Sequence, residues 1–478
     1  MPKPVQQRRV RSVRLSDLVS ALSYALDLTE GQPVGHAQRS CVLGIRLGQA
    51  MGLPEDELAD LYYALLLKDS GCSSNAARMV QILGSDEISS RQDLKLIDWR
   101  SVDWSTLVHS LRHVRVGRPT WERLLALSQR AWKRHRRPKE VAAIRGERGA
   151  SIALKMGFPR RTAEAIGNLD ERWDGSGNPL GLEGDRIPIA ARIVSLAQTL
   201  ELFHRHSGMP AALRVARARS GRWFDPELVR AAHAIAQLDS LDNELAYASQ
   251  TVARLSPAEG NVAAGGDRVD VICEAFAEVV DAKSPYTSEH SRRVTQTAVG
   301  TASQMGASKA TLTLIRRAAL LHDLGKLSVP NSILEKPTEL TSEEWSVVKR
   351  HPYHSEAILK RIEGFEEIAI VAGAHHERLD GGGYFRGSAA DQLSMATRIL
   401  SVADVFDALA GRRPYRAAVP RDEVFSIMRR EAPHALDGDC IDALVASQRA
   451  LHAVQAPDGR QLLQSRLGSR GAPHSGLS

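Results

Sequence analysis

Cysteine, aromatic residues and long apolar segments are all scarce in this chain of 478 residues. The four cysteines stand far apart, with no Cys-x-x-Cys spacing: Cys41, Cys72, Cys273 and Cys440. This argues against a thiolate metal site or a disulfide framework and predicts buried thiols in a reducing compartment. No apolar run is long enough to cross a bilayer and no signal peptide is recognisable, so we expect a cytoplasmic protein without membrane association.

Positive charge is in excess but unevenly distributed. The formal net charge is +7, and twelve Lys or Arg residues fall between Arg112 and Arg148. Such a stretch is most often a solvated surface. Aromatic residues make up only 5% of the chain and no nucleic-acid-reading motif is visible, which argues against nucleic acid as a partner.

Histidine and aspartate recur through the second half in short motifs. The central one is His-Asp in Ala319-Leu-Leu-His-Asp-Leu-Gly-Lys326, and the whole set is His290, His322, Asp323, His351, His375, His376 and Asp404. Imidazole combined with carboxylate suits iron, manganese, zinc or nickel. The set exceeds what one ion readily uses, so it predicts a dinuclear hydrolytic centre.

The spacing of apolar residues predicts an all-α fold. Leu312, Ile315, Ala319 and His322 are three, four and three residues apart, which places them on one helical stripe facing a core. A second stripe runs from Ile368 to His375. Thr341 with Glu344 three residues later predicts a capping box at another helix start. Several helices therefore bring histidine to one interior, where a shared metal would give these polar groups a partner.

The chain also repeats itself, which predicts two helical bundles in tandem. Matching segments occur in the same order in both halves: 66–71 with 320–325, 149–152 with 355–358, 170–181 with 376–387, and 191–197 with 397–403. We expect a first domain at 14–235, a linker at 236–267, a second domain at 268–452 and a disordered tail at 453–478.

Most of the candidate ligands are missing from the first copy. It retains counterparts of His290 and Asp323, namely His36 and Asp69. The other ligand positions have become Lys68, Arg145, Leu169, Asp170 and Gln198. Because two cations stand where imidazoles should bind a cation, we expect the first copy to hold no metal.

The second half resembles the HD-GYP family of the HD phosphohydrolase superfamily. The resemblance covers about 271–450 and is carried by HDLGK at 322–326, HHE at 375–377, DGGGY at 380–384 and RPYR at 413–416. It implies an all-α bundle that hydrolyses cyclic di-GMP to pGpG or GMP with iron or manganese.

The resemblance also assigns roles to residues. It implies that the seven histidines and aspartates above are the metal ligands and that Asp323 bridges two ions while hydroxide attacks phosphorus. Lys326 falls on a phosphate-contacting lysine that could steady the leaving oxygen. Arg413 and Arg416 fall on basic positions that hold the dinucleotide. An arginine fork suits a phosphate or the acceptor edge of guanine.

Two positions depart from the family pattern. Tyr286 stands where some members have a glutamate for a third metal, so two ions are expected. Phe385 replaces the proline of the Gly-Tyr-Pro motif, which leaves the role of that loop in substrate shaping or partner docking open.

The sequence leaves two other functions open. One is a metal phosphohydrolase that acts on another nucleotide, because the metal core suits any phosphoester. The other is a non-catalytic sensor that binds a cyclic dinucleotide and signals through a partner protein. The first copy would then serve regulation or packing, and a homodimer is a further option.

Overall fold

The computed structural model describes residues 13–29, 31–72, 137–258, 261–262, 267–284, 287, 289–411 and 418–455. Most of the basic stretch, the expected substrate residues Arg413 and Arg416, the departure at Tyr286 and nearly all of the expected tail lie outside these residues. The described part of the chain is almost wholly helical, so the predicted all-α class is confirmed.

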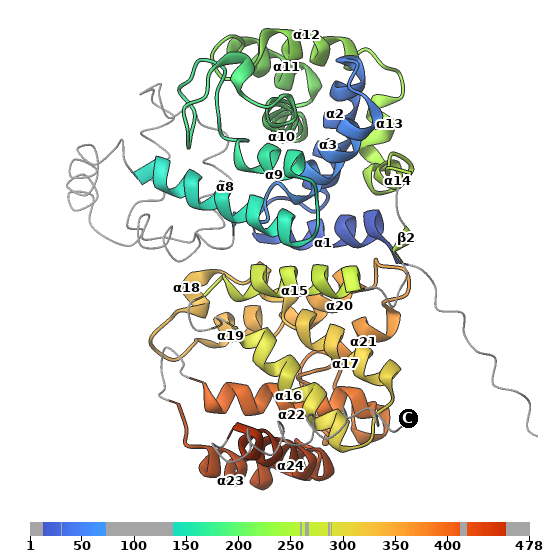
Figure 1. Cartoon of the computed structure of the whole chain (residues 1–478), viewed down its shortest axis with the longest axis vertical. Coiled ribbons are helices and arrows are strands. Elements are labelled where there is room, and N and C mark those ends of the chain that lie inside the picture. Colours follow the sequence, from blue (N-terminus) through green and yellow to red (C-terminus); the bar gives the residue numbers. More distant parts are fainter. Residues whose placement is uncertain are drawn as a thin grey trace, which may run out of the picture.

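Two helical bundles follow one another along the chain, one above the other in Figure 1. The first contains α1 (Leu15–Thr29), α2 (His36–Ala50), α3 (Glu55–Leu67), α8 (Arg137–Lys155), α9 (Arg160–Gly167), η2 (Gly184–Arg186), α10 (Ile189–Ser207), α11 (Met209–Ala218), α12 (Pro226–Ile235), α13 (Leu241–Ala246) and α14 (Ala248–Arg254).

The second bundle contains α15 (Asp267–Asp281), α16 (His290–Gln304), α17 (Lys309–Leu321), η3 (Leu324–Ser328), α18 (Asn331–Leu334), α19 (Ser342–Val348), α20 (His351–Leu359), α21 (Glu366–Gly373), η4 (Ala390–Gln392), α22 (Met395–Ala410), α23 (Arg421–Glu431) and α24 (Gly438–Gln455). Two short strands, β1 (Val13–Arg14) and β2 (Asn261–Val262), complete the described elements.

Side-chain caps fix where several helices of the second bundle begin. Ser308, Thr341 and Ser394 each accept a hydrogen bond from a backbone N–H in the first turn of α17, α19 and α22. Thr341 and Glu344 form the predicted capping box. These caps satisfy N–H groups that have no partner within the helix.

Equivalent contacts recur in the two bundles. Arg192 pairs with Asp225 at 2.8 Å in the first bundle, and Arg398 pairs with Asp437 at 2.9 Å in the second. In each case the arginine lies near the start of a long helix, α10 or α22, and the aspartate just before α12 or α24. The same ion pair at the same place supports the duplication inferred from the sequence.

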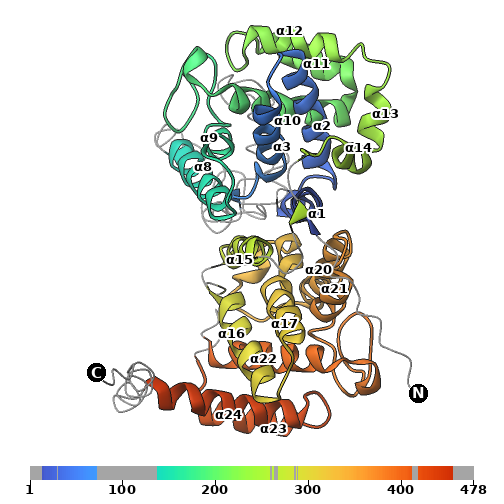
Figure 2. The same cartoon turned by 45° about the vertical axis from the view of Figure 1, so that its right-hand side comes forward.

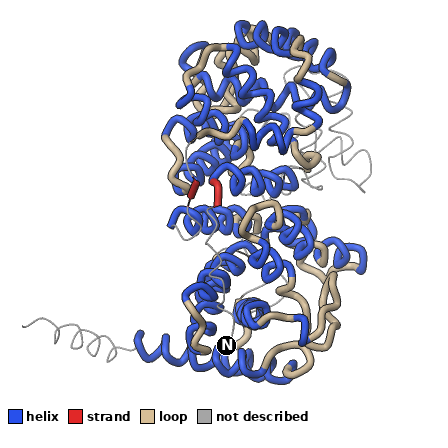
Figure 3. The backbone as a smooth tube through the Cα atoms, turned by 90° about the vertical axis from the view of Figure 1, so that its right-hand side faces the viewer, coloured by secondary structure: helices blue, strands red, loops and turns tan. Residues whose placement is uncertain are grey.

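The bundles meet through their first helices. Figures 1 and 2 show α1 and α15 facing each other at the junction. α1 contacts η3 and α20 of the second bundle, while α15 contacts α8 of the first. Strands β1 and β2 pair antiparallel at the same junction (Figure 3), with Val13 opposite Val262. The first bundle is therefore in direct contact with η3, the turn that follows His322 and Asp323.

The expected linker is partly helical. α13 and α14 lie within residues 236–267, and both contact α2 of the first bundle. Leu241, Leu245 and Val252 are buried there. The chain therefore keeps packing on the first bundle until shortly before β2.

All four cysteines are buried and none forms a disulfide, as predicted. Among the described residues, no helix combines the length and the apolar character that a bilayer crossing requires.

Candidate metal centre

The second bundle gathers all seven predicted ligands into one interior site. His290 and His351 are the first residues of α16 and α20. His322 and Asp323 lie between α17 and η3. His375 and His376 follow α21, and Asp404 lies within α22. Most of the set lies at helix ends. A side chain there can point into the site while the apolar stripe of its helix stays packed in the core.

Asp323 divides the set into two groups. Its Oδ2 lies 3.4 Å from His290 Nε2 and 3.5 Å from His322 Nε2. Its Oδ1 lies 3.3 Å from His351 Nε2 and 3.8 Å from His375 Nε2. One carboxylate thus faces a different pair of imidazoles with each oxygen, which is the arrangement that a bridge between two cations requires.

Asp404 reaches both groups. Its Oδ1 lies 3.3 Å from His290 Nε2 and 3.7 Å from His322 Nε2, while its Oδ2 lies 3.9 Å from His376 Nδ1. His376 is the most accessible of the histidines, with 24% of its side chain exposed. The centre is therefore most open to solvent on the side of His376.

Backbone hydrogen bonds fix the direction of the imidazole lone pairs. His351 Nδ1 donates to Val348 O at 2.8 Å, and His375 Nδ1 donates to Ala372 O at 2.6 Å. In the neutral ring the Nε2 atoms are then acceptors. These two Nε2 atoms lie 3.2 Å apart. Two facing lone pairs cannot bond to each other, but both can bind one cation.

Burial and charge set the protonation states. Burial opposes ionisation of Asp323, but His322 and Lys326 hold its pKa well below the usual range. Burial lowers the pKa of His375 far below its ordinary value and that of His376 to about 3. Ionised carboxylates and neutral imidazoles are the forms that bind metal.

His290 and His322 differ from the other histidines of the site, because nearby carboxylates raise the pKa of both rings although burial lowers it. For His290, burial lowers the pKa, but the neighbouring carboxylates of Asp323, Asp404 and Asp407 outweigh burial and raise it well above the ordinary value. A metal ion facing Nε2 would displace that proton.

Three buried atoms at the centre lack a hydrogen-bond partner among the described residues: His290 Nε2, His322 Nε2 and Asp323 Oδ1. Buried polar groups are normally paired. The ligand atoms also form compact sets within 4.8 Å: His351, His375 and His376; His290, His322 and Asp404; His322, Asp323 and His375. These residues therefore fit divalent cations in their donor chemistry, in their orientation and in their unmet bonding capacity.

Three supporting residues were not identified as part of the site from the sequence. Asp407 accepts from His290 Nδ1 at 2.7 Å and from Arg293 Nε at 2.6 Å. Ser355 Oγ donates to His322 O at 2.6 Å, and Ser401 Oγ donates to His375 O at 2.8 Å. The sequence spacing does place Asp407 on the same helical face as Asp404, three residues later, but assigns it no role. The two serines carry no comparable signal.

Lys326, which the family resemblance places on a phosphate-contacting lysine, lies beside Asp323 at the centre. Its Nζ is 2.5 Å from Asp323 Oδ2, and 18% of its side chain is exposed. The ammonium group is therefore placed to contact an anion that binds at the centre beside Asp323.

In the first bundle, ion pairs occupy the equivalent positions. Lys68 pairs with Asp69, and Arg145 pairs with Asp170. The Lys68 side chain is fully buried. An ammonium and a guanidinium group thus stand among the carboxylates where the second bundle has imidazoles.

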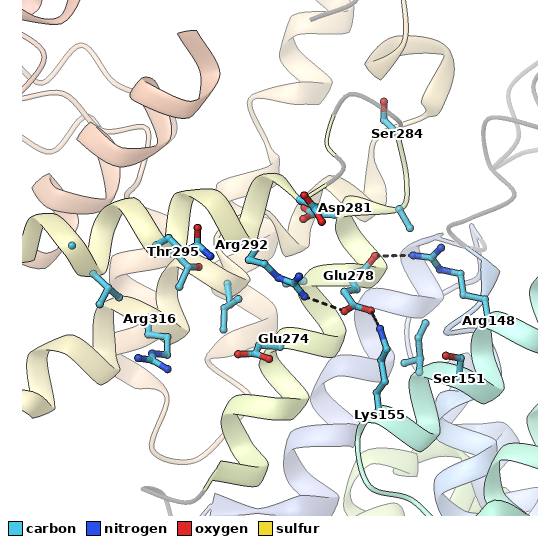
Figure 4. Close-up of a pocket in the computed structure, with 18 of the residues that line it drawn as sticks. Arg148, Ser151, Lys155, Glu274, Glu278, Asp281, Ser284, Arg292, Thr295 and Arg316 are labelled. Atoms are coloured by element: carbon cyan, nitrogen blue, oxygen red, sulfur yellow. Dashed lines mark hydrogen bonds and ion pairs between the residues drawn. The ribbon is translucent and has the colours of Figure 1, made fainter. Parts of the chain in front are cut away.

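A separate hollow of about 1380 Å³ lies between the bundles, lined mainly by α8, α15 and α16. Figure 4 shows Lys155 and Arg292 pointing at the carboxylate of Glu278, and Arg148 pointing at its backbone. Because Glu278 is already paired with cations, this hollow does not offer a metal site comparable to the centre in the second bundle.

Comparisons with known proteins agree with this geometry. The family model for the HD domain matches residues 126–228 and 274–440, and so falls on both bundles. The 3'3'-cGAMP-specific phosphodiesterase 3 of Vibrio cholerae serotype O1 is 40% identical over 433 residues, which is 90% of this chain and 94% of that protein. A crystal structure of a cyclic GMP-AMP-specific phosphodiesterase of Vibrio cholerae covers 92% of this chain and 98% of its own, with a TM-score of 0.65 and 37% identity.

A cyclic di-GMP phosphodiesterase response regulator of Xanthomonas campestris pv. campestris is 36% identical over 181 residues, 37% of this chain and 48% of that protein. The similarity thus extends along most of the chain for the Vibrio protein and over a shorter stretch for the regulator. The chain belongs to the HD-GYP family of HD-domain phosphodiesterases.

Proposed function

We propose that the second bundle hydrolyses a phosphodiester bond of a 3',3'-linked cyclic dinucleotide, with 3'3'-cGAMP as the first candidate. The observation that carries the proposal is the division of the ligand set by the two oxygens of Asp323. Two ions held in this way, iron or manganese, would act as Lewis acids and would lower the pKa of bound water toward neutral pH.

The protein's own residues would then position the reacting groups. His376 and Asp404 lie at the accessible edge, where they would hold a metal ion on the side from which the phosphate approaches. Lys326 donates toward a phosphate oxygen and offsets the negative charge that develops as the P–O bond breaks. Ser355 holds the His322 carbonyl and so keeps the turn that carries Asp323 in place.

The choice of substrate rests on similarity along nearly the whole chain. The relative that is similar over 90% of this chain is named for 3'3'-cGAMP, whereas the cyclic di-GMP relative matches 37% of it. Cyclic di-GMP, the substrate expected from the sequence motifs, is the second candidate. The two molecules differ in one purine, so the metal centre alone does not distinguish them.

The first bundle would support the second without performing hydrolysis. Its Lys68–Asp69 and Arg145–Asp170 pairs fill the equivalent positions with protein cations. Its helix α1 packs on η3, next to Asp323 and Lys326. A change in the position of α1 would therefore reach the centre directly, which suits a regulatory role.

The test is turnover by protein purified without oxygen and loaded with iron or manganese. 3'3'-cGAMP, cyclic di-GMP and cyclic di-AMP are supplied separately, and the products are separated by chromatography. We expect linear dinucleotide from 3'3'-cGAMP, and none from a His322→Ala variant that retains its fold. Protein that carries about two metals per chain but cleaves no cyclic dinucleotide would contradict the proposal.

A further inference from the structure

Two aromatic side chains are exposed beside the metal centre. Tyr353 is 51% exposed and Phe385 is 48% exposed. Their ring centroids lie 5.5 Å apart with an interplanar angle of 74°. Two half-exposed aromatic rings that contact each other form an apolar patch, and such patches mark candidate contact surfaces.

The loop that carries Phe385 contacts a candidate ligand through the preceding residue. Tyr353 lies on α20, two residues after His351. Phe385 follows Tyr384, whose ring centroid is 4.7 Å from that of His376. His376 is also the most exposed histidine of the centre. The loop that carries Phe385 therefore borders the accessible edge of the metal centre, and Tyr353 reaches this loop through its contact with Phe385.

The loop holds Phe385 in an unusual conformation. Phe385 has a φ of +49°, in the left-handed region that residues other than glycine adopt at a cost. Arg386 N donates to Tyr384 O at 2.6 Å across it, and Arg386 N also donates to Glu377 Oε1 at 3.0 Å. The Arg386 side chain pairs with Glu356 of α20. Arg386 thus anchors the loop and also places its guanidinium group 5.3 Å from the Phe385 ring centroid, while about half of the Phe385 side chain stays exposed.

The first bundle provides an internal comparison. At the positions equivalent to Tyr353 and Phe385 it has Glu147 and Pro179. The aromatic pair is therefore present in the copy with the metal ligands and absent from the copy without them. If the pair were needed for the bundle to fold, we would expect aromatic residues in both copies. A role in binding substrate needs them only in the copy with the metal ligands.

We propose that Phe385 and Tyr353 form a stacking platform for a purine base of the cyclic dinucleotide. This inference rests on the proposed function. Bases stack on aromatic side chains whatever their sequence, and the base is one sugar away from the phosphate that the metal centre would hold. Lys349, whose Nζ lies 5.4 Å from the Tyr384 ring centroid, adds positive charge at the same edge for the second phosphate.

Steady-state kinetics of metal-loaded protein with 3'3'-cGAMP and cyclic di-GMP test the platform. The variants are Phe385→Leu, Phe385→Trp and Tyr353→Leu, with Tyr247→Ala as a matched control, because Tyr247 is 56% exposed on the first bundle. Leucine keeps the apolar character but removes the π face. Metal content and melting temperature are measured for each variant.

We expect each leucine variant to raise KM about tenfold while kcat stays within about twofold, and tryptophan to preserve KM. The Tyr247 variant should match the wild type. Leucine variants with unchanged KM, or with a lower kcat at unchanged KM, would overturn the platform while leaving the proposed function intact. A wild-type protein that turns over neither dinucleotide would overturn the proposed function itself.

Discussion

Replacing Asp407 with alanine should weaken metal binding without unfolding the protein. Asp407 accepts hydrogen bonds from His290 Nδ1 at 2.7 Å and from Arg293 Nε and Nη2 at 2.6 and 3.0 Å. The bond to His290 leaves the Nε2 lone pair pointing into the centre. Without it, the ring is free to rotate or to change tautomer, and the ligand becomes less basic.

The contacts of Asp407 set the size of the expected loss in metal affinity. Loss of a carboxylate behind a metal-bound histidine lowers metal affinity about 10- to 100-fold, which is about 1.4 to 2.7 kcal/mol. The Arg293 bonds add little to this, because 42% of that side chain is exposed and water can replace the carboxylate. We expect the smaller end of the range for Asp407→Asn, because the amide oxygen can still accept one bond.

Metal content after equilibration with a graded series of chelator concentrations measures the affinity. The matched control is Glu201→Ala, because Glu201 pairs with His36 and Arg39 in the first bundle as Asp407 does with His290 and Arg293. The control should lose stability but retain metal and activity. An Asp407→Ala variant that holds metal as tightly as the wild type would refute the role assigned to this carboxylate.

Three further predictions concern both bundles. Asp323→Asn should abolish phosphodiesterase activity and lower metal content, whereas Asp69→Asn should change neither, as metal analysis and turnover will determine. Lys68→Met should destabilise the protein by about 3 to 5 kcal/mol in urea unfolding, because it leaves the buried Asp69 charge without its ammonium partner; a loss below about 1 kcal/mol would argue against that pairing. Burial raises the pKa of Asp27 from 3.8 to about 7, so the folded state binds this proton more tightly than the unfolded state, and its contribution to stability should fall as pH rises from about 4 through about 7. The melting temperature of Asp27→Asn should depend less on pH across this window, and an identical dependence would contradict the assignment.

Some helices and the family could be read from the sequence because their signals are local. The Thr341 capping box lies within four residues, and the structure contains it. The stripe from Leu312 to Ala319 forms α17, and His322 directly follows that helix. The stripe that ends at His375 was placed less well, because α21 stops at Gly373 and the histidine lies just beyond it. Helix ends depend on tertiary contacts that spacing alone does not encode.

The sequence by itself determined which residue types stand at the centre, because histidine and aspartate in apolar stripes have few other uses. The tertiary structure alone decided which atoms meet. The Asp407–His290 bond joins residues 117 positions apart, and the division of the ligands by the two Asp323 oxygens brings together four separate segments of the chain. It also decided that α1 of the first bundle packs on η3 of the second. Such contacts arise when apolar faces from distant segments are buried together, and periodicity within one segment carries no information about its partner.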